Sequence, residues 1–276
     1  MKIIESFIDK LSLYNNKISI IHSSRVILYS ELVENILLYN SKLDKLKIKR
    51  GEVVFILGDY SFDSISLFFS LALNGNIIVP LTTENEQEIK ERIQITQPDW
   101  IFKLSSNSEN RIEYDVKLPR HVLLDSLIES QSSGLILFSS GSTGKPKAMV
   151  HNLENLLSNY IDKKGKEMNF LVFLMFDHIG GLNTLFNCLS MGVTITIPEN
   201  RNPNDIAKLI APELWKAHTD YIDETLIGLY KENLISVSYN ENLEATFSAT
   251  PEGLKRLKKH YGIVPERDSK DDNSWG

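Results

Sequence analysis

The sequence has little of several features that would each point to a class of protein. Its single cysteine, Cys188, excludes a disulfide framework and a multi-cysteine metal site, and it is typical of a reducing compartment. The net charge of −6 counts against nucleic-acid binding, because phosphate affinity needs clustered excess Lys and Arg. The longest apolar runs, near residues 65–73 and 169–176, are shorter than the roughly 20 residues of a membrane span, and the N-terminal residues lack a signal-peptide core. We therefore expect a cytoplasmic protein that binds no nucleic acid and has no membrane span.

What the sequence does contain is an alternation of short apolar runs with amphipathic stretches. Strands are predicted at residues 18–21, 26–29, 53–57, 77–81, 100–102, 122–124, 135–138, 171–174 and 193–197. Helices are predicted at residues 59–73, 153–162 and 182–191, after the Thr83-Glu84-Asn85-Glu86 capping box, and from Pro203. The polar residues 105–117 predict a surface loop. The alternating βαβ order predicts an α/β fold with mostly parallel sheets flanked by helices.

A polar loop follows the apolar run at residues 135–138. It reads Ser139-Ser140-Gly141-Ser142-Thr143-Gly144-Lys145-Pro146-Lys147. Hydroxyls and free backbone N–H groups bind polyphosphate, glycines let the backbone approach closely, and lysines supply charge. The loop is not a Walker loop, because Pro146 stands where that motif has Ser or Thr. The alternative is an ordinary Gly/Ser surface turn, although such turns rarely follow an apolar strand with so many phosphate-type donors.

The same segment resembles the signature of the adenylate-forming (AMP-binding) superfamily, whose usual form is Thr-Ser-Gly-Ser-Thr-Gly-x-Pro-Lys-Gly. This chain differs by Ser139, which keeps the hydroxyl, and by Ala148 in place of the final glycine. Residues 29–32, 49–54 and 73–81 match N-terminal landmarks of the family in order. The resemblance implies the fold of the N-terminal large domain of acyl-adenylate-forming ligases. It also implies ATP as cofactor, held by Ser139, Ser140, Gly141, Ser142, Thr143, Gly144 and Lys147.

A second motif reads Phe176-Asp177-His178-Ile179-Gly180-Gly181-Leu182. It resembles the family's aromatic-x-His-x-x-Gly-Leu element, which lies beside the acyl substrate. The resemblance implies that His178 orients the substrate carboxylate and that Gly180 and Gly181 shape the substrate pocket. Asp177 could orient the imidazole. The alternative is a capping element, in which Asp177 starts the following helix and His178 is merely packed.

The resemblance weakens towards the C-terminus. Thr250 and Pro251 predict the start of a helix whose Leu254 and Leu257 face inward. The next residues, Tyr261-Gly262-Ile263-Val264-Pro265-Glu266, resemble the family's Tyr-Gly-x-Thr-Glu element but are one residue longer and lack the Thr. The Glu of that family element helps to hold Mg²⁺, so the resemblance implies Glu266 as the candidate Mg²⁺ ligand. We expect an incomplete large domain at residues 1–265 and a disordered polar tail at 266–276. The family's C-terminal domain with its catalytic Lys is expected to be absent.

Three functions remain open from the sequence. The resemblance favours ATP-dependent activation of a carboxylic acid to an acyl-adenylate, impaired by truncation. The acceptor would be coenzyme A or a phosphopantetheinyl carrier, and the partners a small-molecule carboxylic acid with an acyl carrier protein or a separately encoded C-terminal domain. The alternative is a protein derived from this family that holds ATP or a carboxylate without turnover. The third is an unrelated nucleotide-binding α/β domain, against which the ordered N-terminal landmarks count.

Overall fold

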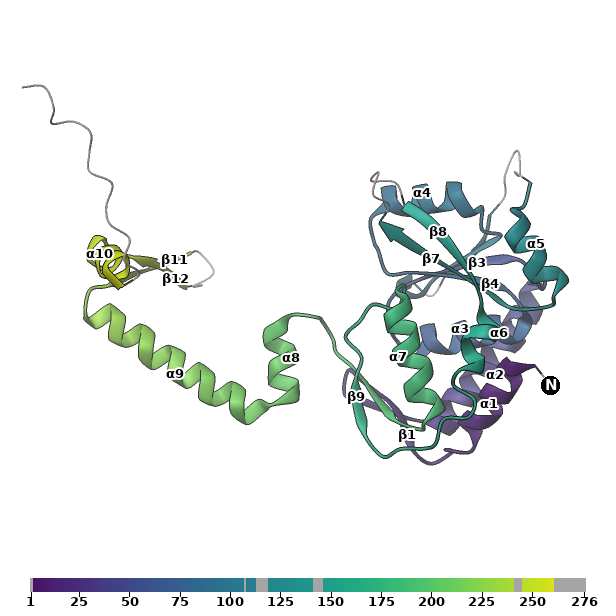
Figure 1. Ribbon diagram of the computed structural model, residues 1–276, viewed down its shortest axis with the longest axis horizontal. Helices are drawn as coiled ribbons and strands as arrows, with labels where there is room; N and C mark the ends of the chain where they lie inside the picture. The colour runs from purple at the N-terminus through teal and green to yellow at the C-terminus, as the bar shows by residue number, and fades with distance from the viewer. Residues whose placement is uncertain (1, 107, 113–118, 141–145, 241–244, 261–276) are drawn as a thin grey trace, which may run out of the picture. The chain divides into compact units, whose positions relative to one another are not determined.

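The computed structural model describes residues 2–106, 108–112, 119–140, 146–240 and 245–260. The chain divides into two compact units, Met1–Glu199 and Asn200–Gly276 (Figure 1). No helix in the described ranges has the length and apolar character needed to cross a lipid bilayer.

A six-stranded sheet with the order β6-β5-β3-β4-β7-β8 forms one layer of the first unit. Its four inner strands run parallel, and the edge strands β6 and β8 run antiparallel to their neighbours. The strands are β3 (Val53–Leu57), β4 (Ile77–Leu81), β5 (Trp100–Lys103), β6 (Ser108–Arg111), β7 (Gly134–Ser140) and β8 (Pro146–Asn152). Val53 to Ile56 of β3 and all of β4 are buried, as expected for parallel strands covered on both faces.

A second sheet has the order β2-β1-β10-β9. β1 (Ile18–His22) and β2 (Arg25–Leu28) form a hairpin, and its turn residues Ser23 and Ser24 both have positive φ, at 48° and 63°. β10 (Thr194–Ile197) joins β1 in parallel, and β9 (Asn169–Leu171) joins β10 in parallel. The N-terminal hairpin is thus tied to residues that lie more than a hundred positions later.

Helices fill the space between the two sheets and cover one outer face (Figure 1). The helices of the inner layer are α1 (Ile3–Ser12), α2 (Tyr29–Leu46), α3 (Phe62–Asn74), α6 (Leu153–Ser158) and α7 (Ile179–Ser190). The outer face of the six-stranded sheet carries α4 (Glu86–Thr96) and α5 (Val122–Glu129). A short 3₁₀ turn, Leu104–Ser106, follows β5. This arrangement confirms the predicted α/β architecture with mostly parallel sheets flanked by helices.

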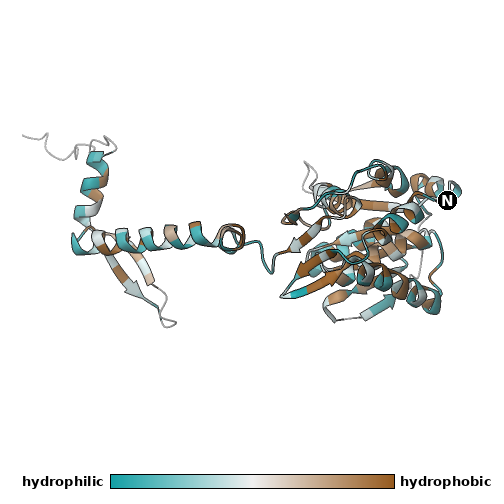
Figure 2. Cartoon of the chain, turned by 90° about the horizontal axis from the view of Figure 1, so that it is seen from below, coloured by the Kyte–Doolittle hydropathy of each residue, from teal (hydrophilic) through white to brown (hydrophobic). Residues whose placement is uncertain are grey.

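The main core lies between the two sheets, where α3 is buried on every side from Ser64 to Ala72. Phe7 stacks on Phe69 at 5.4 Å between ring centroids, and Phe68 meets Phe186 at 5.8 Å. Burying one such ring stabilises the fold by about 1.5–3 kcal/mol relative to leaving it exposed. Figure 2 shows the apolar residues gathered in the strands and facing helices of this unit.

The second unit has a different character. It comprises α8 (Pro203–Ile210), α9 (Pro212–Lys231), β11 (Ile235–Tyr239), β12 (Ala245–Ala249) and α10 (Pro251–His260). As predicted, α8 begins at Pro203, and the side chain of Asn202 accepts a hydrogen bond from the Asn204 amide. The strands form a two-stranded antiparallel sheet, and all residues of β12 are exposed. Among the residues described in this unit, one large apolar side chain is buried, that of Leu234.

Several local expectations are corrected by the structure. Residues 122–124 are the first turn of α5, not a strand, because Leu124 and Leu127 bury one helical face against the sheet. Part of the expected loop at 105–117 is β6, which pairs with β5 through backbone hydrogen bonds despite its polar side chains. Asn85 caps α4 in place of Thr83, since its side chain accepts from the amides of Gln87 and Glu88.

Other predicted elements differ in extent or in orientation. The strand expected at residues 171–174 is β9, Asn169–Leu171, and the helix expected at 153–162 is α6, Leu153–Ser158. Leu254 and Leu257 of α10 are about half exposed, at 50% and 51%, so they do not face inward. The predicted boundary at residue 265 lies outside the described residues, as does the tail at 266–276, and both stay predictions.

Candidate active site

A cavity of about 870 Å³ lies where the end of β7 meets β8, α4 and the start of α7. Leu137, Phe138 and Ser139 line it from β7, and His178 and Gly180 line it from the segment that opens α7. Its volume lies within the range of about 300–1,000 Å³ that is usual for small-molecule sites. The carboxyl ends of parallel strands are where open α/β sheets bind ligands. The cavity is therefore the candidate active site.

His178 stands at the N-cap position of α7, and its side chain is 62% exposed. Its Nδ1 lies 2.8 Å from Oδ1 of Asp177. The other oxygen of Asp177, Oδ2, accepts hydrogen bonds from the backbone N–H and the hydroxyl of Thr82, at 3.0 and 2.9 Å. Asp177 is thus anchored to the residue that follows β4. In the neutral imidazole this arrangement places the proton on Nδ1 and leaves Nε2 as an acceptor.

The turn that carries these two residues is closely packed. Phe176 is fully buried, lies edge-on to Tyr60 at 5.0 Å, and donates its backbone N–H to Asp59 Oδ1 at 3.3 Å. A Cβ on Gly181 would lie 2.1 Å from the backbone oxygen of Met175, so glycine is required there. Gly180 faces the cavity, and a Cβ there would meet Leu174 at 3.3 Å. Both glycines line the cavity, and Gly181 also allows the close packing of the turn.

The structure describes the two ends of the predicted phosphate loop. Ser139 lies opposite Lys147 in the β7–β8 register, and Ser140 lies opposite Pro146. Paired residues of an antiparallel ladder share a face of the sheet, so exposed Lys147 stands on the same face as Ser139, which lines the cavity. Gly141, Ser142, Thr143 and Gly144, and the candidate metal ligand Glu266, lie outside the described residues.

Arg92 of α4 was not predicted from the sequence as part of the site. It lines the cavity, and its guanidinium lies 5.4 Å from the Phe138 ring centroid and 2.9 Å from Glu88 Oε2. The hydrogen bond from Arg92 is the main cause that lowers the pKa of Glu88. The sequence shows only an acid and a base four residues apart, a spacing that is typical of any exposed helix face.

A metal site is not formed by side chains within the described ranges. Among them no group of three or more His, Cys, Asp or Glu side chains is placed to hold a metal ion. Cys188 is buried, and burial raises the pKa of its thiol to about 11, as expected for a packed residue that is not a nucleophile. The described lining offers the Ser139 hydroxyl, the anchored His178, the Arg92 guanidinium and the carboxylates of Glu88 and Glu91. Lys147 lies opposite Ser139 in the hairpin.

The fold is thus an α/β fold with a mostly parallel sheet, with a cavity at the end of β7 beside a hairpin that bears Ser139 and Lys147. The model of the family described as "AMP-binding enzyme" matches residues 8–219. The chain belongs to that family. This result confirms the resemblance found from the loop at residues 139–147 and from the three upstream segments.

Curated relatives and solved structures agree with this assignment. A D-alanine–D-alanyl carrier protein ligase of Staphylococcus aureus (strain bovine RF122 / ET3-1) is 25% identical over 170 residues, which cover 54% of this chain and 35% of that protein. The same ligase from strain Newman is 28% identical over 141 residues, covering 46% of this chain and 29% of the ligase. The chain thus spans about a third of the length of these relatives.

Two solved structures share the fold. The Klebsiella oxytoca NpsA N-terminal subdomain in complex with 3-hydroxyanthranilyl-AMSN matches with a TM-score of 0.60 and 18% identity, covering 76% of this chain and 57% of that one. The Bacillus subtilis o-succinylbenzoate CoA synthetase (MenE), bound to its acyl-adenylate intermediate OSB-AMP, matches with a TM-score of 0.58 and 18% identity. That match covers 74% of this chain and 58% of the synthetase. At these identities the likeness establishes the fold.

Proposed function

We propose that this chain activates a carboxylic acid with ATP. A carboxylate oxygen of the acid would attack the α-phosphorus of ATP, the bond from that phosphorus to the bridging oxygen would break, and pyrophosphate would leave. The observation that carries the proposal is the anchored pair Asp177–His178 beside Ser139 in one cavity. Such chemistry consists mainly of positioning and of charge stabilisation, which these residues can supply.

Each site residue has a role in this proposal. His178 would orient the acid carboxylate as an imidazolium, whose Nε2–H donates to that carboxylate while Nδ1–H donates to Asp177. Lys147 and the hydroxyls of Ser139, Ser142 and Thr143 would bind the β- and γ-phosphates. Ser140, Gly141 and Gly144 would bring the backbone close to them. Mg²⁺, for which Glu266 is the proposed ligand, would neutralise phosphate charge when bound.

We further propose that the acyl-adenylate is passed to a thiol acceptor, either coenzyme A or a phosphopantetheinyl carrier. The family and the carrier-protein ligases of S. aureus support an acceptor of this kind. The proposed partners are accordingly a small-molecule carboxylic acid and an acyl carrier protein or a separately encoded C-terminal domain. Holding ATP or the acid without turnover remains the competing outcome of the test below.

The test is acid-dependent exchange of labelled pyrophosphate into ATP, with a panel of aliphatic, aromatic and amino acids. We expect one chemical class of acid to support exchange. His178→Ala should lower the exchange rate by at least tenfold and leave the affinity for ATP nearly unchanged, because the imidazole acts on the acid. His218→Ala, at an exposed histidine of α9, is the matched control. ATP binding without exchange for any acid would favour the non-catalytic alternative.

A further inference from the structure

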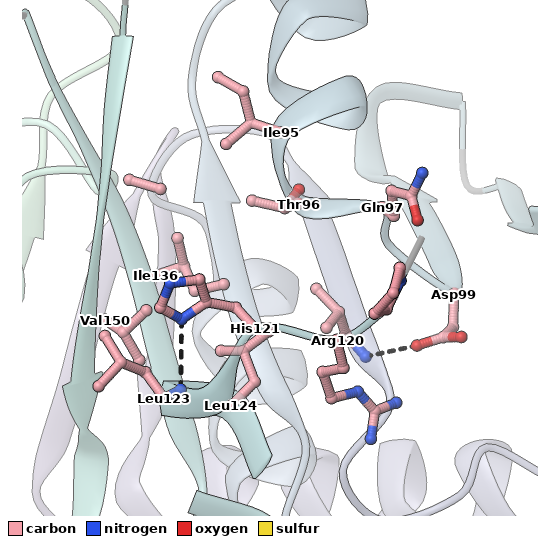
Figure 3. A pocket seen from close by; sticks show the side chains of 13 residues that line it. Ile95, Thr96, Gln97, Asp99, Arg120, His121, Leu123, Leu124, Ile136 and Val150 are labelled. Atoms are coloured by element: carbon pink, nitrogen blue, oxygen red, sulfur yellow. Dashed lines mark hydrogen bonds between the residues drawn. The ribbon is translucent and has the colours of Figure 1, made fainter. Parts of the chain in front are cut away.

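A second cavity lies between the β7–β8 hairpin and the helices α4 and α5 (Figure 3). Its volume is about 410 Å³, and Ile136, Ala148 and Val150 form its floor. Leu137, Ser139 and Met149 line the larger cavity, together with Phe138 and with Arg92 of α4. The two cavities have no lining residue in common, although β7, β8 and α4 contribute to both, so they are separate sites.

The walls of this second cavity come from the two helices on the outer face of the sheet. α4 contributes Ile95 at its C-terminal end, and α5 contributes Leu123 and Leu124 in its first turn. These side chains and the floor are apolar, so the interior favours a hydrocarbon or aromatic group. An apolar chamber with a few polar groups at its rim is the usual form of a small-molecule site.

The polar groups that remain for a ligand are mainly donors. His121 Nδ1 accepts the Leu123 backbone N–H at 3.2 Å, so the neutral imidazole carries its proton on Nε2 and offers a donor there. Arg120 is exposed and forms no ion pair within the residues that the structure describes. Figure 3 shows Asp99 and His121 on opposite sides of the cavity with Arg120 between them.

Asp99 is an acid in the same lining, and its charge must be considered. Its Oδ2 accepts the backbone N–H of Val53 at 2.8 Å, and the residue is 9% exposed. That oxygen is engaged at the start of β3, and the Asp99 carboxylate lies on the side of the cavity away from His121. The cation among the described lining residues is Arg120, whose guanidinium pairs well with a carboxylate in planar geometry.

We propose that this second cavity binds a small monocarboxylic acid with an apolar body, its carboxylate held by Arg120. The ligand needs no ATP and does not touch the proposed catalytic residues. The site is thus distinct from the cavity beside His178, and it offers a place where an acid could bind without being activated. This inference does not rest on the proposed function.

The test is the binding of 4-fluorobenzoate to the full chain without ATP, measured by ¹⁹F NMR, with 4-fluorobenzyl alcohol as the neutral analogue. Ala148→Phe, which fills the floor from β8, should abolish binding at this site. Arg120→Ala should lower the affinity for 4-fluorobenzoate about tenfold, and Arg120→Lys should lower it less. The wild type should bind the alcohol more weakly than the acid, and Arg120→Ala should not change the affinity for the alcohol.

Met149→Phe is the matched control, because it is the neighbouring residue of β8 and faces the larger cavity. It should leave this binding unchanged. Equal binding by the wild type, Ala148→Phe and Arg120→Ala would overturn the proposal, and so would loss of all binding in Met149→Phe. Arg120→Ala alters an exposed side chain and should fold normally. Its affinity for 4-fluorobenzoate therefore tests the proposal even if Ala148→Phe does not fold. Pyrophosphate exchange, measured separately, tests the proposed function without bearing on this result.

Discussion

The two compact units of the chain differ in what defines their structure. In the first unit, Phe7, Phe68 and Phe186 are fully buried, and the ring of Phe186 contacts the rings of the other two. In the second unit, Leu214 is 74% exposed and Phe247 45% exposed. The elements of the first unit are thus specified by packing between distant segments. Those described in the second are specified by local signals, such as the Asn202 cap and Pro203 at the start of α8.

This difference bears on function, because every described residue of the proposed active site belongs to the first unit. The anchoring of Asp177 by Thr82 depends on β4 and α7 being held in place by the shared core. Loss of that core should therefore impair the site from a distance. The predictions below test the contrast between packed and locally defined structure, in descending order of expected effect.

The largest effect is expected for Phe68→Ala in α3. Phe68 is fully buried and contacts the rings of Phe69, Phe176 and Phe186, at centroid distances of 5.6, 5.7 and 5.8 Å. Truncation of such a residue leaves a cavity and costs about 3–5 kcal/mol. Hydrogen exchange of the β3 and β4 amides measures this loss. A cost under about 1 kcal/mol would contradict the view that packing defines the first unit.

A smaller effect, confined to activity, is expected for Lys147→Ala. Lys147 is exposed on β8, so the free energy of unfolding should hardly change. Binding of ATP or adenylation should weaken by about 1.5–3 kcal/mol, the usual value of a hydrogen bond to a charged group. Lys145→Ala, at the variable position of the family signature, is the control and should matter much less. Pyrophosphate exchange measures both variants. Equal losses of exchange activity would contradict the assignment of phosphate binding to Lys147 rather than Lys145.

Much of the first unit could be predicted from its sequence. The apolar runs at 53–57 and 77–81 are β3 and β4, because both faces of a central parallel strand are covered and the sequence shows this directly. The run at 122–124 was assigned wrongly, because three apolar residues fit a strand and a helix turn equally well. β6 could not be found at all, since its ladder rests on backbone hydrogen bonds to β5.

In the candidate site too, local motifs could be predicted from the sequence, whereas contacts between residues far apart in the sequence could not. His178 was predicted from a local motif, and its exposure and its bond to Asp177 count against the packed-histidine alternative. The contact of Asp177 with Thr82 joins residues 95 positions apart, which no local pattern reveals. Arg92 was missed for the same reason. The second cavity also depends on how α4 and α5 lie on the sheet.

The smallest effect is expected for Leu214→Ala in α9. With 74% of its surface exposed, Leu214 contributes little burial, and Leu and Ala are both good helix formers, so the change should stay within about 0.5 kcal/mol. Leu234→Ala is the matched control in the same unit, since Leu234 is 7% exposed, and it should cost about 2 kcal/mol or more. Hydrogen exchange of the α9 and α10 amides measures both variants. A loss above about 1 kcal/mol for Leu214→Ala would mean that this face of α9 is covered in solution, and the contrast between the two units would then fail at that helix.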